Sequence, residues 1–192
     1  SRHRRHSGST GKLVQGGKHA RMGTHNRLLG LGDNFYLELI AIDPDAVAPG
    51  RPRWFGLDRT DLPADRPRLI HWVARSGDIE ADAAHSAEPP GEILPMERGD
   101  YRWRITVPAD GSLPGDGLVP TLIQWSGVKH PTDLLPDSGL RLVAIAGEHP
   151  EPATVRAQLG TLPILHAHSL STVEGERAAC RGKHQSDQVE ER

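Results

Sequence analysis

The sequence is poor in cysteine and aromatic residues, and it has no long apolar run. Cys180 is the only cysteine among 192 residues, so an internal disulfide is excluded and a reducing compartment is favoured. No apolar stretch approaches the ~20 residues that a membrane-spanning helix needs, which predicts no membrane partner. Lys and Arg (23) nearly balance Asp and Glu (25), which argues against nucleic acid as a general partner. Together these absences predict a cytoplasmic protein.

Common catalytic signatures are missing as well. The sequence contains no G-x-S-x-G motif, no phosphate-binding loop and no dinucleotide fingerprint. Cys180 lies in a polar segment without a neighbouring base that would lower its pKa, so it is not a candidate nucleophile. Nucleophilic hydrolysis and nucleotide-dependent chemistry are therefore not indicated.

The two ends of the chain differ in composition from its middle. Residues 1–11 are basic and rich in Ser and Gly, and residues 174–192 are almost wholly polar. Without apolar periodicity neither end can form a core, so we predict a disordered basic tail and a polar C-terminal tail. The body, 12–173, has the length of one domain.

Within the body, short periodic segments alternate with Pro and Gly, a pattern typical of an α+β protein. Helices are predicted at 78–85, where Asp78 is a suitable N-cap, and at 151–159, which has Pro152 in its first turn. Strands are predicted at 25–31, 35–42, 68–74, 101–107, 119–125 and 140–146.

Several motifs in this body, taken in their order along the chain, resemble a known family. They are GGKH at 16–19, GTHNRLL at 23–29, YLELI at 36–40, RWFGL at 53–57, HW at 71–72, and LVPTLIQW at 118–125 before HP at 130–131. This set is similar to the glyoxalase-like domain proteins of the vicinal oxygen chelate superfamily, which includes glyoxalases, bleomycin-resistance proteins and extradiol dioxygenases. The resemblance covers roughly 16–159.

The resemblance implies paired βαβββ modules whose mixed, mostly antiparallel, curved sheets form a cleft. The first module would occupy about 12–60 without its first strand and helix, and the second about 66–130. An extra βα segment would follow at about 138–173.

The resemblance also implies a metal site, with Glu38 as carboxylate ligand and His71 as imidazole ligand. These donors suit Zn, Mn, Fe or Ni. A ligand from the first strand is missing, however, and Ile123 or Gln124 stands where the superfamily usually has a glutamate. Two ligands of the usual three or four predict weak metal binding, so no cofactor is firmly expected. Alternatively, Glu38 lies on an exposed face and His71 makes a hydrogen bond in the core.

The remaining candidates are polar and aromatic residues of the implied cleft. His25 and Asn26 either bind a polar ligand atom or form hydrogen bonds with the turn at Gly16-Gly17. The four tryptophans either line the cleft or pack in the core; they are Trp54, Trp72, Trp103 and Trp125.

Two functions remain open at this stage. The incomplete ligand set favours metal-free binding of a small molecule in the cleft, with a homodimer as a further possibility. The alternative is a divalent-metal-dependent lyase, isomerase or dioxygenase acting on a small oxygen-bearing metabolite. Whether the protein is an enzyme stays open, because a fold does not determine a reaction.

Overall fold

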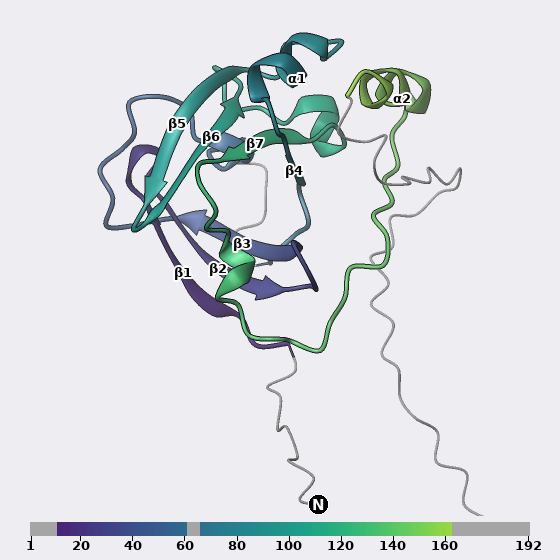
Figure 1. The fold of residues 1–192 in the computed structure, drawn as a ribbon. Coiled ribbons are helices and arrows are strands. Elements are labelled where there is room, and N and C mark those ends of the chain that lie inside the picture. The colour runs from purple at the N-terminus through teal and green to yellow at the C-terminus, as the bar shows by residue number, and fades with distance from the viewer. Residues whose placement is uncertain (1–10, 61–65, 163–192) are drawn as a thin grey trace, which may run out of the picture.

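The chain forms two β-sheets whose inner faces pack together, and the computed structural model describes residues 11–60 and 66–162 (Figure 1). The first sheet is antiparallel, in the order β1-β2-β3. Its strands are β1 (Val14–His19), β2 (Thr24–Gly30) and β3 (Tyr36–Ile42).

The second sheet contains one complete βαβββ module in the order β4-β7-β6-β5. Strand β4 pairs in parallel with β7, whereas β5–β6 and β6–β7 are antiparallel. The elements are β4 (Val73–Arg75), α1 (Ile79–His85), β5 (Glu92–Arg98), β6 (Tyr101–Val107) and β7 (Thr121–Trp125). The α+β fold with mixed, mostly antiparallel sheets is therefore confirmed.

Local sequence explains where these elements begin and turn. The side chain of Asp78 accepts a hydrogen bond from the Ala81 N–H at 3.1 Å and caps α1 as predicted. Strands β5 and β6 are joined by a two-residue turn, in which Gly99 has a φ of 56°, a conformation that glycine adopts without strain.

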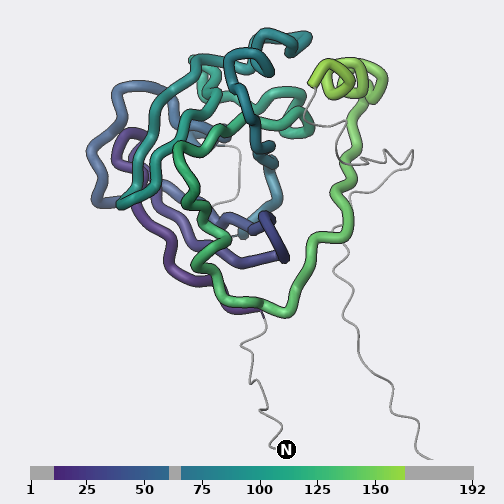
Figure 2. Tube along the Cα trace, in the orientation of Figure 1, coloured from purple at the N-terminus to yellow at the C-terminus, as the bar shows by residue number. Residues whose placement is uncertain are grey.

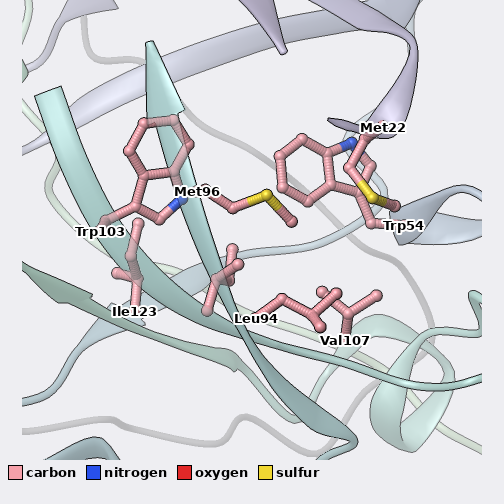
Figure 3. Packing of buried hydrophobic residues seen from close by; sticks show 8 residues of the cluster. Met22, Trp54, Leu94, Met96, Trp103, Val107 and Ile123 are labelled. Carbon is pink, nitrogen blue, oxygen red and sulfur yellow. The ribbon is translucent and has the colours of Figure 1, made fainter. Parts of the chain in front are cut away.

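The main core lies between the two sheets (Figure 3). Alternate residues of β6 point into it, so Trp103, Ile105 and Val107 are buried, and Ile40 of β3 packs against the cluster from the other sheet. A smaller cluster on the opposite face of the second sheet joins Leu122 to Ile79 of α1. The second sheet is thus covered on both faces.

The segment after β7 returns past the first sheet before it reaches the last described helix, α2 (Pro152–Gly160) (Figure 2). The Ser138 hydroxyl donates to the Gly30 carbonyl at 2.5 Å, and the Leu142 N–H donates to the Leu31 carbonyl at 2.9 Å. These bonds attach the segment to the end of β2.

The structure departs from the sequence-based assignment at several elements. Strands β1 and β5 were not predicted, because Gly16-Gly17 interrupts the alternation of one and Pro95 lies inside the other. The strand predicted at 140–146 is absent from the described residues, since that segment has no strand partner and Val143 is 73% exposed. In the described part of the predicted extra βα segment, residues 138–162, the structure contains helix α2 but no strand.

The predicted tails lie outside the described residues, apart from Gly11. No helix in the described part of the chain has the length and apolar character needed to cross a membrane.

Candidate functional site

Asn26 lies at the centre of a buried polar cluster on the inner face of the first sheet. Its Nδ2 donates to Glu38 Oε1 at 2.6 Å, and its Oδ1 accepts from the Gly17 N–H at 2.8 Å and from Arg98 Nη1 at 3.0 Å. We call His19, Asn26, Glu38 and Arg98 the Asn26 cluster. Because Asn26 is only 5% exposed, these bonds offset the cost of burying its amide and hold it in one orientation.

A bulge in β1 makes room for this amide. Gln15 pairs with Arg27 and Lys18 pairs with His25, so Gly16 and Gly17 both lie opposite Asn26. A Cβ on Gly16 would overlap Asn26 Oδ1, and one on Gly17 would lie 2.6 Å from Arg98 Cδ. The GGKH motif therefore has a steric explanation, because a side chain at Gly16 would displace the Asn26 amide and one at Gly17 would displace the Arg98 side chain.

His19 is buried beside Asn26 and is uncharged. Its Nε2 accepts from Arg98 Nη1 at 3.3 Å, which places the proton on Nδ1, 3.0 Å from Thr24 Oγ1. Burial, reinforced by the charge of Arg98, lowers the pKa of His19 to about 3. Its ring makes T-shaped contacts with two buried tryptophans, with ring centroids 5.2 Å (Trp54) and 6.0 Å (Trp103) away.

Glu38 faces inward with Tyr36 and Ile40, whereas Leu37 and Leu39 lie on the exposed face of β3. Burial raises the pKa of the Glu38 carboxyl, and the bond from Asn26 and the charge of Arg98 oppose this effect. Burial and the neighbouring Glu38 raise the pKa of the Tyr36 phenol above its ordinary value. Of the two alternatives for Glu38, the structure shows the inward-facing one.

A row of aromatic rings continues from Tyr36 across to the second sheet. Tyr36 and His130 have ring centroids 5.8 Å apart, and His130 and Trp125 are 5.3 Å apart. Trp125 then contacts Trp103 at 5.2 Å and Tyr101 at 6.1 Å. We call these five residues the aromatic row.

The aromatic row and the Asn26 cluster meet at both ends. Tyr36 is two residues from Glu38 on the same face of β3, and the Arg98 guanidinium lies 5.6 Å from the centre of the Tyr101 ring. A carboxyl, a guanidinium and several aromatic rings are thus linked through successive contacts. This group is the candidate binding site.

His130 is fixed in the row by the short 3₁₀ helix Pro131–Asp133. Its Nδ1 lies 2.7 Å from Thr132 Oγ1, and its backbone N–H donates to Asp133 Oδ2 at 2.7 Å. Burial and the charge of Arg75 lower the pKa of His130. The HP motif at 130–131 therefore positions an uncharged ring next to Trp125.

His71 belongs to a separate hydrogen-bond group. Its Nε2 accepts from the Thr121 N–H at 3.1 Å, which places the proton on Nδ1, 3.0 Å from the Gly117 carbonyl. Burial lowers the pKa of His71 to about 4. This is the hydrogen-bonded core histidine of the alternative interpretation.

In this arrangement His71 does not fit a metal ligand, because its one available lone pair already accepts a hydrogen bond. Within residues 11–60 and 66–162, no three His, Cys, Asp or Glu side chains form a group that could hold a metal ion. Metal binding by Glu38 and His71 stays a prediction, and it requires His71 to exchange its bond from Thr121.

The other predicted site residues are only partly brought together. His25 is exposed on the opposite face of β2 from Asn26, since successive residues of a strand alternate, and Trp72 donates from Nε1 to the Leu118 carbonyl at 2.8 Å. Trp54 is part of the core, where it stacks on Phe55. Asn26, Trp103 and Trp125 do share the site.

Five residues of the site were not predicted from the sequence: His19, Tyr36, Arg98, Tyr101 and His130. Three of them lie in motifs that carried the resemblance, namely GGKH, YLELI and HP, so a signal for them was present. Arg98 had none, because its strand contains Pro95 and was not predicted, and Tyr101 lies in the predicted strand 101–107 but in no motif that carried the resemblance.

Comparison with known proteins identifies the family. Residues 6–162 match the family described as the glyoxalase-like domain. The chain belongs to this glyoxalase-like domain family. The predicted resemblance is confirmed, and the match is consistent with the vicinal oxygen chelate superfamily.

A solved structure supports the fold of this glyoxalase-like domain. The crystal structure of a hypothetical protein from Staphylococcus aureus superimposes with a TM-score of 0.56 and 17% sequence identity, covering 78% of this chain. The matched region spans 65% of the Staphylococcus aureus chain. At this identity the likeness shows the fold alone. No protein with a curated description matches the sequence.

The bulge gives the first testable prediction. Gly16→Ala should lower the free energy of unfolding by about 1–3 kcal/mol, because the new methyl group displaces the Asn26 amide. Gly77→Ala is the matched control, since its Cβ meets nothing within 4 Å, and we expect a change within ~0.5 kcal/mol. Urea unfolding of both variants measures the difference, and equal midpoints would contradict this account of the bulge.

A second prediction concerns acid stability. The pKa of His71 falls from 6.5 to about 4 on folding, so between these values the unfolded chain binds the additional proton and stability decreases as the pH falls. Between pH 6.5 and 5.0 the wild type should therefore lose about 2 kcal/mol more than His71→Gln.

Urea unfolding at the two pH values measures this difference. The control is Gln15→Ala, at an exposed position of β1, which removes no titratable group and should keep the wild-type difference between the two pH values. If wild type and His71→Gln lose the same free energy of unfolding between the two pH values, the His71 imidazole is not buried in its neutral form.

Proposed function

We propose that this glyoxalase-like domain binds a small organic molecule between Glu38 and the aromatic row, without His71 acting as a metal ligand. The observation that carries the proposal is the bond from Asn26 to Glu38 within the β1 bulge. Burying a carboxyl is costly unless it is hydrogen-bonded, and here Asn26 donates to Glu38. Asn26 is in turn held by the Gly17 N–H and by Arg98, in the space that the glycine pair leaves open.

Preorganisation favours binding at this position. The Asn26 amide is already held by the Gly17 N–H and by Arg98, so little side-chain entropy is lost when a ligand contacts Glu38. Because burial raises the pKa of Glu38, its protonated form is favoured relative to that of an exposed glutamate, and this form can donate a hydrogen bond to a ligand oxygen.

The aromatic row supplies the apolar part of the proposed site. Trp125 and His130 are in edge contact, and Trp125 continues into the core through Trp103. Rings supported in this way provide a rigid surface against which a flat or apolar group can pack.

The alternative, a divalent-metal-dependent enzyme, depends on Glu38 and His71 acting together. His71 would have to replace the bond that it accepts from Thr121 with a metal bond, while Glu38 is already held by Asn26. Binding without a metal requires neither change, and we therefore place it first.

The proposal is tested with simple aromatic carbonyl compounds: benzoate, phenylacetate, 2-naphthoate and their primary amides. In EDTA-treated, ¹⁵N-labelled protein, ligand addition should shift the indole signals of Trp103 and Trp125, while Trp72 lies outside the row and serves as internal reference. Glu38→Ala should weaken binding about tenfold through the loss of one buried hydrogen-bonding group.

The control is Glu97→Ala, which removes an exposed glutamate from β5 and should leave affinity unchanged. Two results would contradict the proposal. In one, none of the compounds binds in the millimolar range. In the other, the purified protein carries one equivalent of a divalent ion, and EDTA abolishes binding.

A further inference from the structure

Arg98 is a half-buried arginine whose direct contacts are with uncharged groups. Its Nη1 donates to Asn26 Oδ1 and to His19 Nε2, and its guanidinium lies over the ring of Tyr101. Among the described residues it forms no ion pair with a carboxylate.

Arg21, Arg27, Arg68 and Arg75 likewise form no ion pair with a described carboxylate, but they are exposed. Other arginines of the domain differ. Five of them form an ion pair with a described aspartate or glutamate, as expected where a carboxylate is within reach. The pairs are Arg51–Glu92, Arg53–Asp58, Arg102–Glu97, Arg104–Glu80 and Arg141–Asp137.

The position of Arg98 is built into the fold. Gly17 has no side chain where a Cβ would lie 2.6 Å from Arg98 Cδ, and Asn26 and His19 each present an acceptor to Nη1. None of these contacting groups is charged, and the Glu38 carboxyl, which is bonded to Asn26, interacts with the guanidinium electrostatically and without a direct hydrogen bond.

Two donor atoms of Arg98 remain available. Nε and Nη2 form no hydrogen bond to another described residue. The Nε atoms of Arg51 and Arg53 are also unbonded, but they are fully buried, whereas the two Arg98 atoms are not. Nε and Nη2 lie side by side in the plane of the guanidinium, which matches the two oxygens of a carboxylate.

We propose that Arg98 binds the carboxylate of an organic acid whose apolar part packs on Tyr101 and Trp125. This inference rests on the proposed small-molecule function and adds the ligand class to it. A carboxylate is favoured over a phosphate dianion because the Asn26 cluster offers one guanidinium and no second cation. Burial of Glu38 also favours a carboxylate ligand, because it disfavours the ionised form of the one acidic side chain in the cluster and so reduces repulsion of the ligand.

The test compares each aromatic acid with its own primary amide, which has the same shape without the charge. In wild type, benzoate, phenylacetate and 2-naphthoate should bind about tenfold more tightly than their amides, as charge-assisted hydrogen bonds predict. This preference should decrease as salt is added. Phenyl phosphate should bind no more tightly than benzoate.

Arg98→Gln should abolish the preference for the acid, so that each acid and its amide bind this variant with affinities within about twofold of each other. Arg102→Gln is the matched control, because it removes the same charge from the next strand of the hairpin at an exposed position, and it should keep the full preference. Arg98→Lys, which keeps the charge but not the planar pair of donors, should keep part of the preference for the acid over its amide.

The outcomes separate the two proposals. If acids and amides bind equally well to wild type, the role of Arg98 is refuted while small-molecule binding stands. If Arg102→Gln loses the preference as fully as Arg98→Gln, the overall positive potential of the hairpin selects the acid, and Arg98 has no specific role. If no compound of either kind binds, both proposals fail. The comparison of acid with amide in wild type does not depend on the folding of any variant.

Discussion

The hydrogen bond from Asn26 Nδ2 to Glu38 Oε1 is the interaction on which the arrangement of the site depends. It joins neighbouring strands of the first sheet through side chains, and it determines where the one inward-facing carboxyl of β3 lies. The bond requires an Asn26 amide in one orientation. That orientation is set by the Gly17 N–H and by Arg98, both of which donate to Oδ1.

The same amide connects the two sheets. Arg98 extends from β5 of the second sheet to Asn26 and His19 in the first, while Ile40 of β3 packs into the core formed by β5, β6 and β7. The polar contacts of Arg98 and the apolar contacts of Ile40 therefore both hold the first sheet against the second. A change at Gly16 or Gly17 affects both the bulge and the position of Arg98, so stability and binding are coupled at this point.

Much of the fold was predictable, whereas only part of the site was. The motif order indicated the family, and the strands predicted at 25–31, 35–42, 101–107 and 119–125 correspond to β2, β3, β6 and β7. Strand alternation alone left open which face of β3 was buried, so both alternatives for Glu38 remained. His71 resembled a ligand by its place in the chain, yet it accepts a hydrogen bond from Thr121 and donates one to the Gly117 carbonyl, and both partners are distant in sequence. Arg98 was beyond prediction because its role depends on a bulge in another strand.

The side-chain amide of Asn26 in ¹⁵N-labelled protein tests the central claim most directly. If Nδ2 is bonded to Glu38, its two protons should give separate signals that exchange slowly with water, and Glu38→Ala should remove that protection. The signals should also shift when 2-naphthoate is added, together with the indole signal of Trp125. Rapid exchange in the wild type, or signals unchanged at a saturating concentration of a bound ligand, would contradict a preorganised site centred on Asn26.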